Sequence, residues 1–177
     1  MSSKRRAFTS CYWIVLLTLL VGVLIITFKW RNAEMIRFAN GHYATPLDGR
    51  WQGYTPTEAA DLFNRLGADG RKFYAISEVS LDLVFPFAYG ALLIMLVRRL
   101  WQPSWRSIFV GICILTAGSD LIENGIIAYL AFTYRDSVQP FAYMANLVTL
   151  TKWGLLCIAL LSIFIGALLW LLKARRV

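Results

Sequence analysis

Apolar side chains dominate four long stretches of the chain, at about residues 11–28, 75–97, 107–132 and 139–172. A helix needs about 20 consecutive apolar residues to cross the hydrocarbon core of a bilayer. Inside a bilayer, backbone polar groups must bond to one another, and a helix meets that requirement within one segment. We therefore predict an all-α, polytopic membrane protein, in which residues 1–177 form a single four-helix transmembrane bundle.

The large polar stretch is residues 29–74, between the first two predicted spans. Within it, Thr55, Pro56 and Glu58 are typical of a helix start, with a capping threonine, a proline in the first turn and a glutamate that completes the capping box. The apolar side chains from Pro56 to Leu66 fall on one face of such a helix. We predict a short amphipathic helix in this first extracytoplasmic loop, lying on the membrane surface or over the end of the bundle.

Composition agrees with a membrane protein, because 58% of the residues are apolar and the mean hydropathy is +0.57. The net charge of +8 could indicate a nucleic-acid partner, but basic residues gather in short flanks at 4–6, 98–106 and 173–176. Basic flanks mark the cytoplasmic side of membrane proteins. We therefore predict that both termini are cytoplasmic, in the cell membrane or an equivalent one. The lipid bilayer is the expected partner, and no nucleic acid is.

Cysteine and histidine are too few and too scattered to suggest a metal or redox site. The three cysteines, Cys11, Cys113 and Cys157, all fall within predicted spans, and their odd number does not fit a disulfide framework. His42 is the single histidine and lies in the loop, with no cysteine or second histidine near it in sequence. We expect no metal ion and no cofactor.

The third predicted span contains polar residues that cannot face lipid. Asp120, Glu123 and Asn124 stand at positions i, i+3 and i+4, so they share one face of a helix. A charge at the bilayer centre costs roughly 2.5 kcal/mol or more. That face must therefore look toward other helices or toward a cavity.

The second predicted span carries a similar face. Glu78 and Asp82 stand four residues apart, and Phe85 and Tyr89 continue the same face. Pro86 lacks an N–H group and therefore frees the carbonyl of Asp82, four residues earlier. A freed carbonyl within a membrane helix has to be satisfied by protein or water, so an acid and an open acceptor are expected side by side.

Lys152 in the fourth span is the expected partner of Asp120. At a rise of 1.5 Å per residue, both lie roughly 15–20 Å from the outer ends of their helices. A buried ammonium and a buried carboxylate persist when they are paired. Asp82 and Glu123 have no second cation within the predicted spans, so they need protons, water or a cationic ligand.

These residues predict a polar, outward-opening cavity in the outer half of the bundle, with the Pro56–Leu66 helix near its mouth. The predicted ligand-binding residues are Glu78, Asp82, Phe85, Tyr89, Asp120, Glu123, Asn124, Thr149, Lys152 and Trp153. If the site is catalytic, its candidates are Asp82, Asp120, Glu123 and Lys152.

The stretch Asp82-Leu83-Val84-Phe85-Pro86-Phe87 resembles the EXPERA superfamily of four-span membrane proteins, which includes the emopamil-binding sterol isomerases. The layout is also similar, with a large loop and a surface helix between the first two spans. The resemblance implies a lipophilic ligand of sterol or amine size near Asp82, Asp120 and Glu123. Those isomerases use a histidine beside the second-span acid, and no predicted span here contains one. The resemblance therefore implies a class of ligand rather than the isomerase reaction.

Three classes of function remain open from the sequence. The first is a site that binds or acts on a small lipophilic or lipid-like molecule. The second is a structural or assembly subunit whose buried charges specify helix packing. The third is a small proton- or cation-coupled carrier, for which four helices suggest a homodimer. A hydrolase with Asp82 and Asp120 as a facing pair is a further alternative, but Lys152 nearby would disturb the shared proton of such a dyad.

Overall fold

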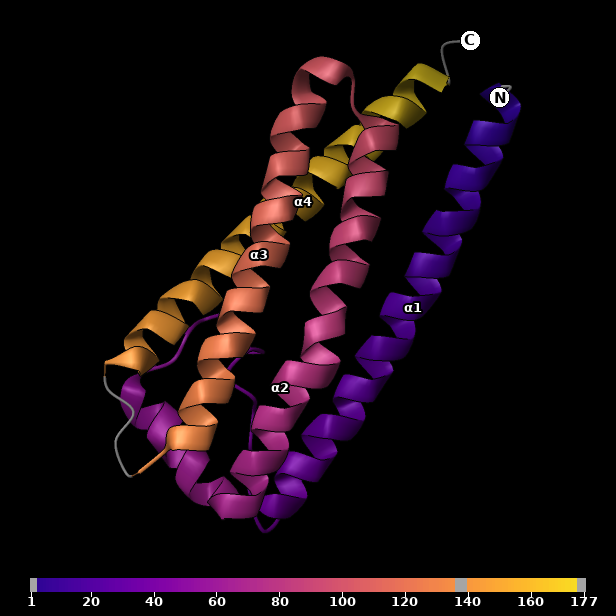
Figure 1. Ribbon diagram of the computed structural model, residues 1–177. Helices are drawn as coiled ribbons and strands as arrows, with labels where there is room; N and C mark the ends of the chain where they lie inside the picture. Colours follow the sequence, from indigo (N-terminus) through magenta and orange to yellow (C-terminus); the bar gives the residue numbers. More distant parts are fainter. Residues whose placement is uncertain (1–2, 136–139, 175–177) are drawn as a thin grey trace.

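The computed structural model describes residues 3–135 and 140–174, and the secondary structure of this part is helical. The helices are α1 (Ser3–Phe38), α2 (Pro56–Leu100), α3 (Pro103–Thr133) and α4 (Phe141–Ala174). Each contains a segment long and apolar enough to cross a membrane. The predicted all-α, four-helix membrane architecture is therefore confirmed. Figure 1 shows the two chain ends and the α2–α3 turn at one end of the bundle, which we call the turn end. The loop of residues 39–55 lies at the opposite end (Figure 1), which we call the loop end.

Helix α1 extends ten residues beyond the span that the apolar pattern predicts. The pattern stops at Phe28, but residues 29–38 contain no glycine or proline, so the helix continues to Phe38. It ends where Asn40 and Gly41 adopt positive φ angles of 54° and 81°. The Gly41 amide then donates to the Ile36 carbonyl at 2.9 Å, as in common helix C-caps. The polar residues after Phe28 are consequently part of the bundle.

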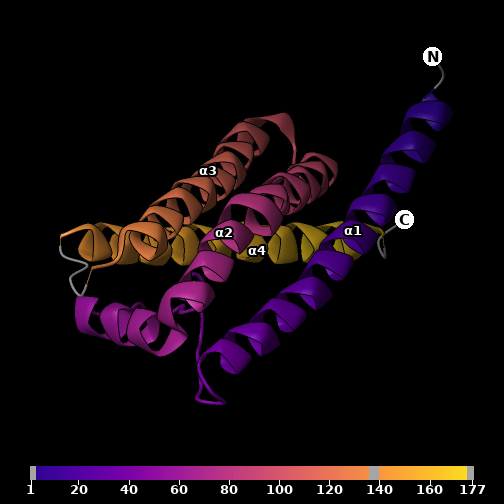
Figure 2. The ribbon, with the colours of Figure 1, turned by 60° about the horizontal axis from the view of Figure 1, so that its bottom comes forward.

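Helix α2 joins the predicted amphipathic helix and the second span. The capping box is present: the Glu58 amide donates to the Thr55 hydroxyl at 3.2 Å, and the Thr55 amide donates to the Glu58 carboxylate at 2.7 Å. The amphipathic helix predicted over Pro56–Leu66 does not end after Leu66 but bends sharply there, because Gly67 has φ 63° and ψ −175°, a conformation open to glycine. Figure 2 shows the segment before this bend lying at an angle to the rest of α2.

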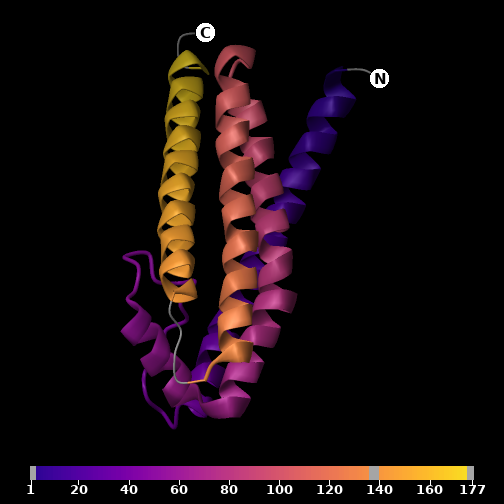
Figure 3. The same ribbon diagram turned by 60° about the vertical axis from the view of Figure 1, so that its left-hand side comes forward.

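Packing is uneven among the four helices. Helix α2 packs against both α1 and α3, α3 packs against α4, and α2 touches α4 less extensively. Among the described residues, α1 packs against neither α3 nor α4. Figure 3 shows α1 leaning away from the other helices toward the turn end. The start of helix α4 that the pattern predicts, at residue 139, lies outside the described residues.

Two apolar clusters hold the bundle together, one at each end. The larger one, at the loop end, includes Met35, Leu47, Phe63, Tyr74 and Ile127, all fully buried. The smaller one, toward the turn end, consists of Tyr89, Leu93, Val97, Cys113 and Ala159. The buried charged side chains lie between these two clusters along the helices, so the fold encloses a polar layer.

Candidate functional site

The polar layer contains six buried charged side chains from all four helices. They are Arg31, Glu78, Asp82, Asp120, Glu123 and Lys152. Each has at most 7% of its surface exposed, so none is hydrated as it would be on a surface. Charges removed from water to this extent persist when they are paired. They form two groups, one around Lys152 and one around Arg31.

The Lys152 cluster joins α4 to α3. The ammonium of Lys152 lies 3.2 Å from the Asp120 carboxylate and is also ion-paired with Glu123. Glu123 in turn accepts a hydrogen bond from the Thr149 hydroxyl, one helical turn before Lys152. The predicted pairing of Asp120 with Lys152 is confirmed, and Glu123, which was expected to lack a cation, shares the same lysine.

The Arg31 cluster joins α1 to α2 and to the loop. One guanidinium nitrogen of Arg31 contacts Glu78 at 3.2 Å and is also ion-paired with Asp82. The other terminal nitrogen lies 3.0 Å from the Asp48 carboxylate. Arg31 is therefore a second cation within the bundle, and the expectation that Asp82 has no cation is wrong. The error follows from the length of α1, because the apolar pattern assigns Arg31 to the loop.

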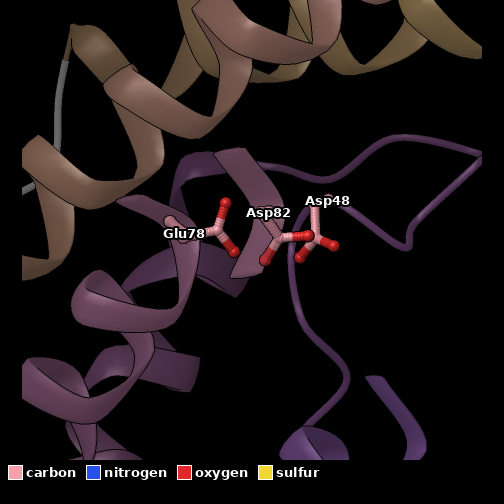
Figure 4. Close-up of side chains that lie close together, drawn as sticks. All are labelled: Asp48, Glu78 and Asp82. Carbon is pink, nitrogen blue, oxygen red and sulfur yellow. The ribbon is translucent and has the colours of Figure 1, made fainter. Parts of the chain in front are cut away.

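Three carboxylates converge on Arg31, two from α2 and one from the loop. Figure 4 shows Asp48, Glu78 and Asp82 close together, and one oxygen of each lies within 4.8 Å of the others. Oxygen ligands at this spacing are what divalent cations prefer. Here the guanidinium of Arg31 contacts all three carboxylates, so the chain itself supplies the positive charge.

Asp48 connects the two clusters. Its carboxylate contacts Arg31 and accepts a hydrogen bond from the Tyr74 hydroxyl at 3.0 Å. Its backbone carbonyl accepts from Lys152 Nζ at 3.1 Å and from Trp153 Nε1 at 3.2 Å. Since α1 and α4 do not pack together in the described structure, this loop residue links them. Burial raises the pKa of the Asp48 carboxyl, but the charges of Arg31 and Lys152 outweigh burial and hold that pKa below its usual value.

The carbonyl that Pro86 frees has a partner on the neighbouring helix. Pro86 lies inside α2, and the Asp82 carbonyl accepts a hydrogen bond from Asn124 Nδ2 at 2.7 Å. An amide on α3 therefore satisfies the acceptor. Three buried carboxylate and amide oxygens have no hydrogen-bond partner among the described residues, and one of them, Glu123 Oε2, is ion-paired with Lys152. The other two are Glu78 Oε2 and Asn124 Oδ1. They are the acceptors that this layer leaves over.

A cavity of about 470 Å³ lies beside the polar layer. At the end near the loop its lining is polar and includes Arg31, Asn32, Asp48, Asp82, Asp120 and Lys152. The remainder is lined largely by apolar side chains, namely Val21, Ile25, Phe28, Phe85, Leu92, Leu93, Leu156 and Leu160, together with Tyr89 and Trp153. The cavity thus combines a charged end with an apolar body.

The cavity opens sideways between α1 and α4. Ile25 of α1 and Leu160 of α4 both line it, although 47% and 51% of their surfaces are exposed. These two helices do not pack against each other in the described residues, so nothing there closes the gap between them. In a bilayer, lipid would border this opening. Toward the loop end, Asp48 and Gly49 are part of the lining.

The predicted ligand-binding residues divide into two sets. Six of them line the cavity: Asp82, Phe85, Tyr89, Asp120, Lys152 and Trp153. The other four, Glu78, Glu123, Asn124 and Thr149, are buried and do not line it. The Pro56–Leu66 helix contributes no lining residue, so its predicted place at the mouth is wrong. Its apolar face packs into the cluster at the loop end, and the loop around Asp48 borders the cavity instead.

Sequence reasoning missed Arg31 and Asp48. A signal for Arg31 was available, because three acids facing one lysine require another cation or a proton source. The absence of a helix breaker after Phe28 also indicates that α1 continues through Arg31. No comparable signal exists for Asp48, since the path of a loop depends on tertiary packing.

Comparisons with known proteins add nothing to this geometry. The chain matches no protein-family model, no curated protein and no solved structure.

Proposed function

We propose that this membrane protein binds a small amphiphilic, lipid-like molecule in the cavity between α1 and α4. The observation that carries the proposal is the division of the cavity into a charged end and an apolar body. A purely structural core would have no reason to leave such a space open. Its volume, about 470 Å³, falls within the range of small-molecule sites.

The sideways opening supports a ligand that is dissolved in the membrane. An apolar tail could lie against Val21, Ile25 and Leu160 and extend into the surrounding lipid through the gap. The polar group would then rest near Asp82 and Asp120. This orientation keeps charge away from hydrocarbon and apolar surface away from water.

The residues at the charged end of the cavity favour a ligand group that donates hydrogen bonds or carries positive charge. Arg31 and Lys152 are each held by two or more carboxylates, so neither is free for an anionic group. Five carboxylates face these two cations, and the excess of acceptors attracts donors. The resemblance of residues 82–87 to the EXPERA superfamily supports the same class of ligand.

Equilibrium binding of radiolabelled octadecylamine to the detergent-solubilised full chain tests the proposal, with stearic acid as the anionic probe of equal chain length. We expect saturable binding of the amine at least tenfold tighter than that of the acid. Asp82→Asn should weaken amine binding at least tenfold, because Asp82 lines the cavity. Arg31 keeps Asp48 and Glu78 as partners in this variant, so the thermal unfolding midpoint should change little.

Glu123→Gln is the matched control. It also removes one carboxylate from a cluster whose cation keeps another partner, but Glu123 does not line the cavity. We expect amine binding within twofold of the unaltered chain. Failure of the unaltered chain to bind the amine saturably, or equal binding of amine and acid, would contradict the proposal.

A structural or assembly role is the second candidate, and a specific observation favours it. The two clusters link α1 to α2 and α3 to α4, so their charges could serve only to fix the arrangement of the helices. In that case Asp82→Asn would lower the unfolding midpoint, and the amine would bind neither protein. The two readouts therefore separate the candidates.

A further inference from the structure

The chain segregates its charges between the two ends of the bundle. The acidic residues that the structure describes lie before Leu83 or at Asp120 and Glu123, toward the loop end or the middle. At the turn end, by contrast, Arg98, Arg99 and Arg106 occur with no acidic residue near them in sequence. The basic end therefore has a strong positive field that the protein does not itself neutralise.

A second groove, of about 310 Å³, lies at this end between α2 and α4. Helix α2 supplies Leu96, Arg99 and Leu100, and α4 supplies Ile163, Ala167, Trp170 and Leu171. Their spacing of three to four residues places each set on one face of its helix. The groove is thus an apolar furrow along the bundle, with one guanidinium group in its lining.

The two helices that form the groove are fixed against each other. The indole N–H of Trp101, next to the end of α2, donates to the Ser162 carbonyl of α4 at 3.1 Å. Gly166 approaches so closely that a Cβ atom there would lie 2.8 Å from Trp101 Nε1 and 3.0 Å from Leu100 Cβ. This tight crossing sets the spacing of α2 and α4 beside Ala167, so the groove is a built feature of the fold.

Arg99 is the charged residue in the lining of the groove, and its guanidinium group is not ion-paired with any described carboxylate. Its side chain is exposed, and no carboxylate among the described residues lies within ion-pair distance of it. Trp170, 56% exposed, lines the same groove, and tryptophan favours the headgroup level of membranes. The groove thus joins an acyl-sized apolar surface to an unpaired guanidinium at interface depth.

We propose that this groove binds an anionic phospholipid, with an acyl chain between α2 and α4 and the phosphate at Arg99. Guanidinium groups bind phosphate oxygens through paired N–H donors, and basic pockets between membrane helices are known to take anionic headgroups. A soluble anion would gain nothing from the apolar wall. The site is separate from the cavity between α1 and α4, and the proposal goes beyond the function proposed for that cavity.

Native mass spectrometry of the full chain, purified in a mild detergent, tests this site with dioleoylphosphatidylglycerol and dioleoylphosphatidylcholine as the two probes. At equal lipid concentrations, we expect the bound fraction of phosphatidylglycerol to exceed that of phosphatidylcholine at least tenfold. Arg99→Gln should bring the ratio close to one. Arg65→Gln, at an exposed arginine near the loop end, should leave it unchanged.

A second pair of variants tests whether the groove itself is used. Ala167→Trp should fill the furrow and reduce phosphatidylglycerol binding at least fivefold, whereas Leu168→Trp, at the next and exposed position, should not. If Ala167→Trp fails to fold, Ala167→Leu replaces it, with a smaller loss expected. Equal retention of both lipids, or full preference in Arg99→Gln, would overturn the proposal. So would an unaffected Ala167 variant, because diffuse surface attraction would then explain the preference.

Discussion

The Arg31 and Lys152 clusters both neutralise carboxylates inside the bundle, the first with a guanidinium group and the second with an ammonium group. Arg31 contacts three carboxylates from α2 and the loop, and its planar fork of N–H groups can address several acceptors at once. Lys152 contacts two carboxylates of α3 through one compact ammonium. Through these ion pairs, Arg31 of α1 holds together three chain segments, namely α1, α2 and the loop. The lysine fixes one pair of helices and, through the Asp48 carbonyl, the same loop.

The largest difference is expected when each cation is removed. Arg31→Met leaves two buried carboxylates and the partly buried Asp48 without their cation, whereas Lys152→Met leaves two buried carboxylates. Breaking a buried ion pair costs about 3–5 kcal/mol, so we expect the upper end of this range or more for Arg31 and the lower end for Lys152. Chemical unfolding of the detergent-solubilised variants, with matched protein concentration, measures both.

Arg65→Met is the control for these substitutions. Its ion pair with Asp61 is exposed, and such pairs contribute roughly 0–1 kcal/mol. If Arg31→Met lowered the free energy of unfolding no more than Arg65→Met, the cluster around Arg31 would not stabilise the fold.

A smaller effect is expected from coupling within the Lys152 cluster. Lys152→Met alone leaves Asp120 and Glu123 without a cation, and adding Asp120→Leu removes one of these two unpaired carboxylates. The double variant should therefore be more stable than the sum of the single losses predicts, by about 0.5–3 kcal/mol. Full recovery is not expected, because Glu123 remains without its cation. Strictly additive losses in unfolding experiments would reject the pairing.

The smallest effect concerns the acid dependence of the loop that connects the clusters. The pKa of Asp48 is lowered in the folded chain, so its contribution to stability is complete above its unfolded pKa of about 4 and is lost as pH falls through the lower, folded value. The stability difference between the unaltered chain and Asp48→Asn should be constant from about pH 5 to 8 and shrink below about pH 4. Unfolding midpoints measured across this range would show it. A difference that grows as the pH falls would contradict the sign of the shift.

The sequence predicted the fold class and the Asp120–Lys152 pair because both depend on position along a helix. Four apolar stretches define four spanning helices, and the rise per residue brings Asp120 and Lys152 to one depth. The carbonyl freed by Pro86 was also predictable, and Asn124, on the predicted polar face, satisfies it. These features follow from local periodicity.

The Arg31 cluster could not be predicted with the same rules. Apolar length measures the thickness of the hydrocarbon, so it places the end of the span at Phe28 although the helix continues to Phe38. The position of Asp48 is harder still to predict from sequence, because tertiary contacts place the loop against the bundle. The Leu47 side chain packs into the apolar cluster, and the Leu47 amide donates a hydrogen bond to the Tyr74 hydroxyl. Which end of the bundle faces the cytoplasm stays a prediction from the basic flanks.

The central claim, that the cavity between α1 and α4 holds an amphiphile, is tested most directly by the position of a photoreactive label. The probe is a long-chain primary amine with a diazirine midway along its chain, at the part of the tail that would lie inside the cavity, added to the full chain in phosphatidylcholine vesicles. After irradiation, mass spectrometry should find label that excess octadecylamine displaces on the α1 segment around Val21 and Ile25 and on the α4 segment around Leu156 and Leu160. Displaceable label on lipid-facing positions such as Ile114 and Leu115 of α3, or no displaceable label at all, would contradict the claim.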